Sequence, residues 1–333
     1  MAALLQIRDL HVTYRTGGEL LAAVRGVDLS IGGGESVGVA GESGCGKSTL
    51  ASTVLRLQPK NAEVSGEVLV DGRDVLTMRW GHLRAVRWAD ASVVFQGALH
   101  SLNPVQRIGD QIAEPIRLHD REVGREVADA RVAELLEQVG LPTSRARSYP
   151  HQLSGGQRQR VMIAMALACR PSLIIADEPT TALDVMVQAQ VLGVLTGLVA
   201  DLGLGLMLIS HDLSVLATTC DRVVVMYAGR IIEEAAAHSI FADPRHPYSA
   251  ALAAAFPRVG DPAARFAPAG LAGDPPDPRR LPAGCTFHPR CSMAVDDCRV
   301  VDPPLESVSV GHPVACIRAG ETRVAAPVRR ATS

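Results

Sequence analysis

The residues best suited to chemistry lie in one glycine-rich stretch near the N-terminus. Residues 41–48 read GESGCGKS and end in Lys47 and Ser48. Glycines permit backbone angles that turn successive N–H groups toward one point, and such a concave nest binds nucleotide phosphates. The lysine can reach the β- and γ-phosphates, and the serine hydroxyl can ligate Mg²⁺. The expected phosphate loop comprises Gly41, Glu42, Ser43, Gly44, Cys45, Gly46, Lys47, Ser48 and Thr49.

The residues on either side predict the elements that position this loop. Residues 36–40 form a short apolar run, and residues 48–57 contain neither Gly nor Pro. A strand should therefore lead into the loop and a helix should leave it, with the positive end of the helix dipole facing the phosphates. A chance glycine-rich turn is the alternative, and this context argues against it.

A second glycine pair opens another expected helix. Residues 153–157 read LSGGQ and precede a run typical of a helix, which Pro171 stops. Ser154 is the expected N-cap, and the N–H groups of the two glycines are free to bind an anion. Alone, this pattern would indicate no more than a glycine-rich cap.

Two adjacent carboxylates follow about twenty residues later. The apolar run 173–176 predicts a strand, and Asp177 and Glu178 stand at its end. Asp177 would hold Mg²⁺ directly or through water, and Glu178 would polarise the attacking water of a phosphoryl transfer. Two such acids are often a solvated turn, but after a phosphate loop they predict a nucleotide-hydrolysing site.

In this order the motifs resemble the ATP-binding-cassette (ABC) ATPases, and the resemblance covers about residues 1–245 as one cassette. Tyr14 matches the aromatic residue that stacks on adenine, and Gln96 matches the glutamine that senses Mg²⁺, the attacking water and the membrane partner. Residues 182–184 (ALD) match the loop that crosses the dimer interface, and His211 matches the switch histidine. A lone Tyr or His is usually a packing residue, so the shared order carries the resemblance.

The resemblance implies a fold and a mechanism. The fold would be α/β, a P-loop NTPase cassette with a RecA-like core, an antiparallel β subdomain and a helical signature subdomain at about residues 97–168. Two cassettes would bind ATP head to tail, each nucleotide lying between one phosphate loop and the partner's signature residues. Those are Ser154, Gly155, Gly156 and Gln157, with Asp184 at the interface. The implied catalytic residues are Lys47, Gln96, Glu178 and His211, and the implied Mg²⁺ ligands are Ser48, Gln96 and Asp177.

The remaining patterns also indicate an α/β protein. Strand patterns cover residues 4–31 with a turn at Gly17-Gly18, and continuous apolar runs typical of a parallel sheet with both faces covered occur at 173–176 and 204–209. Shorter strands are expected at 66–70 and 93–95. Residues 127–139 predict a helix whose apolar positions are Val132, Leu135, Leu136 and Val139.

Composition narrows the class of protein. The chain has 333 residues, 47% hydrophobic and 20% charged, and its net charge of −2 does not favour nucleic acid. Aromatic residues make up 3%, which leaves few platforms for stacking bases. Apolar runs such as 202–209 are far shorter than the roughly 20 residues of a membrane span. The N-terminus lacks the pattern of a signal peptide, so we expect a cytosolic protein that reaches the membrane through a partner.

The composition changes after about residue 243. Pro and Ala dominate residues 261–282, which predicts a linker or irregular arm, and the last dozen residues suggest a loose tail. Residues 246–333 resemble the C-terminal extension of the ATPase subunits of oligopeptide, dipeptide and nickel importers. The stretch 95–112 resembles that family too, except that Gly97-Ala98 stands where many members carry an acidic residue and proline.

Four cysteines cluster in this extension: Cys285, Cys291, Cys298 and Cys316. Their thiolates could ligate zinc or an iron–sulfur cluster. The close Cys-x-x-Cys pairs of a zinc ribbon are absent, and the resemblance favours a 4Fe–4S cluster, with four reduced structural thiols as the alternative. We expect a structural or regulatory role, because nothing in the sequence places this segment at the phosphates.

Cys45 supports a separate hypothesis. It lies in the phosphate loop beside a helix N-terminus and Lys47, and such neighbours lower a thiol pKa. We therefore expect alkylation of Cys45 to block ATP binding and MgATP to protect it. An inert spacer is the alternative.

Together these expectations describe the ATP-hydrolysing subunit of a peptide importer, peripheral to the cytoplasmic face of the cell membrane. Its cofactors would be ATP and Mg²⁺. The expected partners are a paralogous second ATPase, two transmembrane permeases and an extracytoplasmic substrate-binding protein, without nucleic acid. The alternatives are a soluble ABC ATPase acting on nucleic acid or ribosomes, an importer of nickel or another small solute, and a regulatory ATPase without transport.

Overall fold

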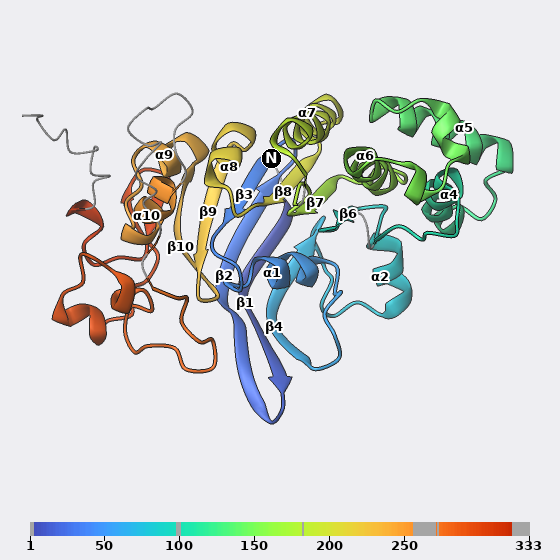
Figure 1. Ribbon diagram of the computed structural model, residues 1–333. Coiled ribbons are helices and arrows are strands. Elements are labelled where there is room, and N and C mark those ends of the chain that lie inside the picture. The colour runs from blue at the N-terminus through green and yellow to red at the C-terminus, as the bar shows by residue number, and fades with distance from the viewer. Residues whose placement is uncertain (1–2, 98–100, 182, 256–270, 272, 322–333) are drawn as a thin grey trace, which may run out of the picture.

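The computed structural model describes residues 3–97, 101–181, 183–255, 271 and 273–321 (Figure 1). Expectations for Ala98, Ala182, half of the arm at 261–282 and the last dozen residues lie outside these ranges.

Two β-sheets form the centre of the chain. The smaller sheet is antiparallel, with the order β2-β1-β4-β5. Its strands are β1 (Ala3–Thr16), β2 (Glu19–Gly32), β4 (Ala62–Val70) and β5 (Arg73–Asp74). The expected strands and the Gly17-Gly18 turn are confirmed, but β4 starts at Ala62 rather than at residue 66, because its polar first half pairs with β1.

The larger sheet has the order β11-β12-β10-β9-β3-β8-β7-β6. Five consecutive strands at one side of it are parallel: β3 (Ser36–Ala40), β6 (Ala91–Val94), β7 (Leu173–Asp177), β8 (Gly205–Ile209) and β9 (Arg222–Tyr227). An antiparallel extension follows in β10 (Arg230–Ala236), β12 (His312–Val314) and β11 (Glu306–Ser309). The carboxyl ends of the parallel strands meet at one edge, where α/β folds bind ligands.

Alternate residues of the parallel strands face two separate cores. In β8, Met207 and Ile209 pack toward the antiparallel sheet, whereas Leu206 and Leu208 pack toward the helices. All four side chains are fully buried. Cover on both faces explains why these strands read as continuous apolar runs.

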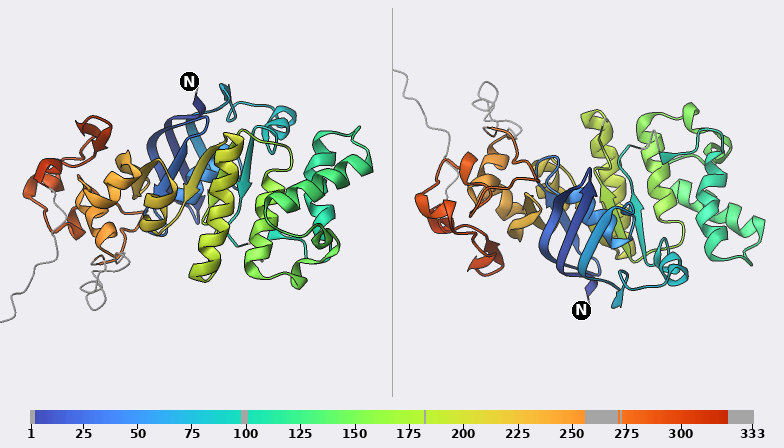
Figure 2. Two further views of the ribbon diagram at one scale, coloured as in Figure 1. Left: turned by 90° about the horizontal axis from the view of Figure 1, so that it is seen from above. Right: turned by 90° about the horizontal axis from the view of Figure 1, so that it is seen from below.

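Helices cover the second face and form a separate block at one end (Figure 2). The block lies between β6 and β7 and contains α4 (Ile108–His119), α5 (Arg125–Gln138) and α6 (Gly155–Ala166), with 3₁₀ turns η1 (Thr143–Arg147) and η2 (Pro150–Gln152). The other helices are α1 (Lys47–Val54), α2 (Trp80–Val86), α7 (Val185–Leu202), α8 (Leu213–Thr219), α9 (Ala237–Ala242) and α10 (Pro247–Ala255). The apolar face predicted for α5 is buried.

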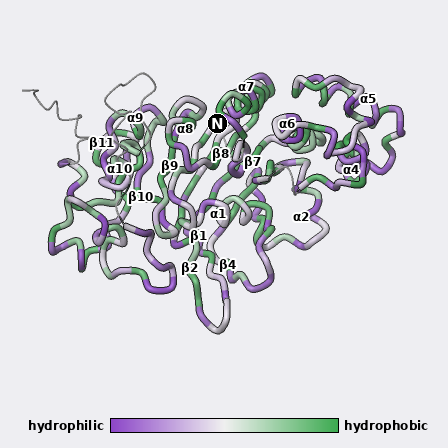
Figure 3. The backbone as a smooth tube through the Cα atoms, viewed as in Figure 1, coloured by the Kyte–Doolittle hydropathy of each residue, from purple (hydrophilic) through white to green (hydrophobic). Residues whose placement is uncertain are grey.

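One helix is longer than the apolar runs noted in the sequence. α7 has 18 residues with a mean hydropathy of 1.6, so by length and composition it could cross a membrane, and Figure 3 shows its apolar character. In the fold it connects the neighbouring parallel strands β7 and β8 and packs on α6. Val191, Leu195 and Val199 are buried in the core. This is the position of an α/β crossover helix, not of a membrane span.

The C-terminal segment, described at residues 246–255, 271 and 273–321, lies at the end opposite the helical block (Figures 1 and 2). Residue 271 and residues 273–321 are mostly irregular, with the short 3₁₀ turns η4 (His288–Arg290), η5 (Asp296–Arg299) and η6 (Ala319–Glu321). The segment joins the larger sheet through β12, which pairs with β10.

Candidate nucleotide site

The phosphate loop connects β3 to α1, as expected. Gly41 and Gly46 adopt φ angles of 148° and 104°, which L side chains rarely adopt. A Cβ atom would lie 2.4 Å from the Met226 carbonyl oxygen at Gly41 and 2.2 Å from the Ala23 carbonyl oxygen at Gly46. Glycine is thus required at both positions by close backbone approach.

Lys47 closes the loop on itself. Its side chain is 5% exposed, and its Nζ donates hydrogen bonds to the carbonyl oxygens of Gly41 at 2.7 Å and Glu42 at 2.8 Å. A buried ammonium needs such acceptors, and anionic phosphate oxygens can replace them.

Ser48 and Asp177 provide a pair of oxygen ligands. The Ser48 hydroxyl donates to the Asp177 carboxylate at 3.1 Å. Burial raises the pKa of Asp177, and the charge of Glu178 adds to this, while the Ser48 hydrogen bond opposes it. Hydroxyl and carboxylate oxygens are the hard ligands that Mg²⁺ prefers, so these residues fit the ion.

Glu178 lies where the other two expected catalytic side chains meet. Gln96, just after β6, donates its Nε2–H to Glu178 Oε2 at 3.0 Å. The Nδ1 atom of His211, just after β8, lies 3.6 Å from the same oxygen, and Thr181 donates to it at 2.9 Å. Glu178 itself adopts φ 43°, a left-handed conformation that is strained for a non-glycine residue and typical of functional sites.

Tyr14 lies beside the start of α1. Its hydroxyl donates to Thr49 at 3.3 Å, and both residues line an open cavity together with Ser48 and Asp177. The antiparallel sheet therefore contributes an aromatic side chain to the same cavity as the loop.

The signature residues do not join this group within one chain. Ser154 caps α6, since its hydroxyl accepts from the Gln157 N–H at 3.3 Å and the Gln157 side chain accepts from the Ser154 N–H at 3.1 Å. Gly156 packs on α7, where a Cβ would lie 2.4 Å from Val187. Asp184 caps α7 by accepting from the Val187 N–H at 3.0 Å. Among the described residues, their hydrogen bonds go elsewhere than to the phosphate loop.

Two side chains that the sequence did not indicate hold the loop from outside. The Glu42 N–H donates to the Tyr248 hydroxyl at 2.8 Å. The Glu42 carboxylate accepts from both terminal nitrogens of Arg290, at 2.7 and 3.0 Å. The expectation that nothing places the C-terminal segment at the phosphates is therefore wrong. Neither contact has a local sequence signal, because the partners are more than 200 residues apart.

The expected lowering of the Cys45 thiol pKa is also wrong, whereas the expected effect of alkylation on ATP binding stays a prediction. Cys45 is 6% exposed, and burial raises its pKa. Lys47, whose Nζ lies 3.8 Å from the sulfur, lowers the pKa by less. Desolvation thus outweighs the nearby charge, and the thiol is neither accessible nor activated.

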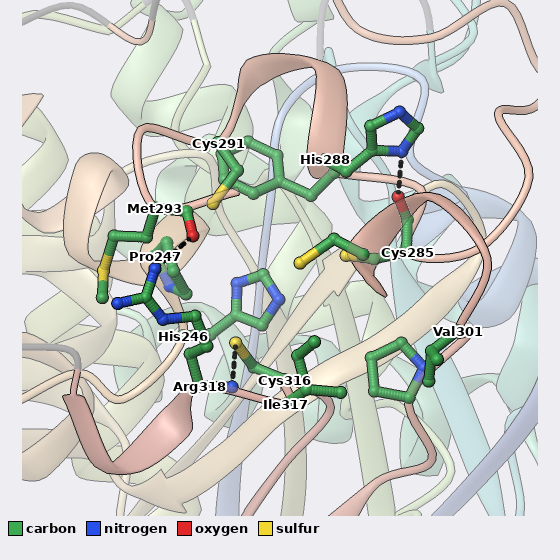
Figure 4. A pocket seen from close by; sticks show the side chains of 13 residues that line it. His246, Pro247, Cys285, His288, Cys291, Met293, Val301, Cys316, Ile317 and Arg318 are labelled. Atoms are coloured by element: carbon green, nitrogen blue, oxygen red, sulfur yellow. Dashed lines mark hydrogen bonds between the residues drawn. The ribbon is translucent and has the colours of Figure 1, made fainter. Parts of the chain in front are cut away.

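The four clustered cysteines line one pocket, the cysteine pocket, with His246, Phe287 and Arg318 (Figure 4). The Cys285 N–H donates to the Cys298 carbonyl at 2.9 Å, and Cys316 Sγ accepts from the Arg318 N–H at 3.4 Å. Burial raises the pKa of Cys316 to about 11. Within the described ranges, no three His, Cys, Asp or Glu side chains are grouped so as to hold a single metal ion.

Comparisons with known proteins agree with this geometry. Residues 24–181 match the family described as ABC transporter, and residues 232–298 match that described as oligopeptide/dipeptide transporter, C-terminal region. The chain is 44% identical over 329 residues to a putative peptide import ATP-binding protein of Brucella ovis, covering 95% of this chain and 97% of that protein. It is 42% identical over 317 residues to the oligopeptide transport ATP-binding protein OppD of Salmonella typhimurium, covering 95% and 93%.

The chain also matches OppD of Mycobacterium tuberculosis, with 44% identity over 320 residues and 96% of this chain covered, but it spans about half (52%) of that protein. Among solved structures, the dimeric ABC transporter cassette MJ0796 superimposes with a TM-score of 0.63 and 31% identity, covering 70% of this chain and 98% of that one.

The two sheets, the helical block and the loops at the carboxyl edge define an ATP-binding cassette. The C-terminal match and the curated relatives narrow the class. The chain belongs to the ATP-binding proteins of ABC transporters of the oligopeptide/dipeptide type.

Proposed function

We propose that this chain hydrolyses ATP to power the import of peptides through a membrane ABC transporter. The proposal rests mainly on one observation: Gln96 and His211 converge on the same carboxylate oxygen of Glu178, beside the phosphate loop. The match of residues 232–298 to the oligopeptide/dipeptide C-terminal region supports peptide as the cargo over nickel or another small solute.

Each side chain has a defined task in this proposal. Lys47 exchanges its two loop carbonyls for the β- and γ-phosphate oxygens, and Tyr14 stacks on adenine. Glu178 accepts a proton as water attacks the γ-phosphorus and the bond to the ADP oxygen breaks. His211 contacts the γ-phosphate, and Gln96 orients the water. Ser48, Gln96 and Asp177 would hold Mg²⁺, which would supply positive charge to the phosphates.

A second cassette completes the site. Ser154, Gly155, Gly156 and Gln157 of one chain would cover ATP bound by the other, with Asp184 at the interface. The absence of any hydrogen bond from these described residues to their own phosphate loop supports a role between chains. Closure is then a population shift, because these contacts form only in the ATP-bound dimer.

We further propose the division of the chain and its assembly. Residues 1–245 would be the cassette, with a helical subdomain at about 97–168, and residues 246–333 the importer-type extension. The assembly would contain a paralogous ATPase, two transmembrane permeases and an extracytoplasmic binding protein, and this chain would lie at the cytoplasmic face of the membrane without binding nucleic acid.

We also propose that Cys285, Cys291, Cys298 and Cys316 ligate a 4Fe–4S cluster. All four line one pocket, and four thiolates are the usual ligand set. Anaerobically purified protein should contain about four iron and four sulfide per chain, with a cluster absorption band that Cys→Ser variants lose. Iron and sulfide near zero would leave reduced structural thiols as the explanation.

The test of the function is to purify the tagged chain from membranes of its native cell in mild detergent. Two multispanning permeases and a second cassette protein should co-purify, and a binding protein that retains peptide would identify the cargo. A binding protein that retains nickel would replace peptide by metal. Recovery only from the soluble fraction, with ribosomes or nucleic acid, would contradict the transport proposal.

A further inference from the structure

We propose that Arg290 is a positioning residue for the phosphate loop, and that it makes ATP binding depend on the C-terminal segment. The inference rests on the proposed ATP site and adds to it a residue from outside the cassette.

The contact between Arg290 and Glu42 is a paired, two-point interaction. Both terminal nitrogens of the guanidinium donate to the two carboxylate oxygens, at 2.7 and 3.0 Å, across 248 residues of sequence. The Arg290 side chain is 6% exposed and that of Glu42 is 24% exposed. Two parallel charge-assisted hydrogen bonds fix orientation as well as distance, and burial limits screening by salt.

The C-terminal segment reaches Glu42 at a second point. Tyr248 accepts the Glu42 N–H, and its ring lies 4.7 Å from Tyr227 and 5.4 Å from Phe287, measured between ring centroids. Phe287 also contacts Tyr227, and Arg290 follows Phe287 by three residues. The backbone and side chain of Glu42 are therefore both held by one aromatic cluster and its neighbouring arginine.

The position of Glu42 explains why this matters for ATP. Glu42 is the second residue of the loop, and its carbonyl oxygen also accepts from Lys47 at 2.8 Å. An unpaired carboxylate beside the bound triphosphate would repel it, and at a partly buried site such repulsion is strong. Arg290 neutralises this carboxylate and keeps it directed toward the C-terminal segment. Its effect on ATP thus operates through Glu42.

A double-mutant cycle tests this route. MgATP binding is measured by calorimetric titration of the full chain and of the variants R290Q, E42Q and R290Q/E42Q. R290Q should raise the Kd for MgATP at least tenfold in the wild-type background and less than twofold in the E42Q background. The KM for ATP should rise in R290Q while kcat stays within twofold. R290K, which keeps the charge but not the two-point geometry, should lie between R290Q and the wild type.

The matched control is R299Q. Arg299 lies nine residues from Arg290 in the same segment, but its side chain is 72% exposed and pairs only loosely with Asp296, at 3.9 Å. The Kd of the R299Q variant for MgATP should equal that of the wild type. The thermal midpoint of each variant, measured without nucleotide, separates loss of folding from loss of binding. The double variant contains no unpaired buried charge, so it keeps the test valid even where R290Q folds poorly.

The outcomes separate the two proposals. A Kd for R290Q within twofold of the wild type, or an equal effect of R290Q in both backgrounds, would overturn the role of Arg290 and leave the ATPase proposal standing. A wild-type chain that does not bind MgATP would overturn both.

Discussion

The nucleotide site and the C-terminal segment share one sheet but are built from different kinds of structure. In the nucleotide site, the three side chains that meet at Glu178 each follow a parallel strand: Gln96 after β6, Glu178 after β7 and His211 after β8. Beyond α10, the C-terminal segment contains short 3₁₀ turns and the two short strands β11 and β12 in its described part. Regular strands position the first region, whereas buried polar contacts hold the second.

Glu233 illustrates how those contacts work. Its side chain is fully buried on β10 and accepts hydrogen bonds from the N–H groups of Arg245 and His246, at 2.6 and 2.9 Å. The Nε2 atom of His312 on β12 lies 2.7 Å from the same carboxylate. One residue of the cassette thus binds both the start of the segment and its returning strand. The difference teaches that a region without a periodic apolar pattern can still be specified by a few buried charges, provided that every one has a partner.

The largest effect is expected from E178Q, which tests the strand-built region. Removing the base at the carboxyl edge should lower kcat for ATP hydrolysis at least about 100-fold. The Kd for MgATP should stay within a few-fold of the wild type, because the phosphate loop is intact. Single-turnover hydrolysis and titration measure the two quantities, with E306Q on the exposed strand β11 as the control. A kcat within tenfold of the wild type would remove Glu178 from the catalytic role.

The next effect is expected from E233A, which tests the polar region. The variant leaves two backbone donors and His312 without their buried acceptor. The free energy of unfolding should fall by about 3–5 kcal/mol, because each buried donor that loses its acceptor costs about 1–3 kcal/mol. Urea denaturation measures it, and E306A should change it by less than about 0.5 kcal/mol. A loss below about 1 kcal/mol for E233A would mean that apolar packing, not this carboxylate, holds the segment.

The smallest effect concerns pH. His246 is 1% exposed, and burial lowers its pKa to about 4, although the nearby Glu233 carboxylate opposes the shift. In the unfolded chain the imidazole binds a proton near its ordinary pKa of about 6.5. Between those values the unfolded state holds more protons, so stability is present above about pH 6.5 and is lost as the pH falls toward 4.

The loss attributable to His246 should be about 3 kcal/mol. In the wild type, His246 Nδ1 accepts a hydrogen bond from the Tyr248 N–H at 3.0 Å. H246N keeps an acceptor for this N–H and should flatten the dependence of stability on pH between about 4 and 6.5. H82Q, at an exposed histidine, should leave the profile unchanged. Parallel profiles for H246N and the wild type would show that other groups cause the acid loss.

The same contrast explains what the sequence could predict. The strands, the phosphate loop and the Ser154 cap follow from local patterns, since glycine, alternation and capping residues act within a few positions. The pairing of Arg290 with Glu42 and the burial of Glu233 join residues far apart through irregular chain, and no periodicity marks them. The prediction of the Cys45 pKa failed for a related reason, because the sequence shows the neighbours of this thiol but not its burial.

The contact between Glu42 and Arg290 also has a consequence for the time at which the site is completed during synthesis. The two residues are 248 positions apart, and ribosomes add about 5–20 residues per second, so roughly 10–50 s separate their appearance. Throughout that interval a nascent cassette has its phosphate loop but not the arginine that neutralises Glu42. The chain would thus gain full affinity for ATP only after the C-terminal segment has left the ribosome.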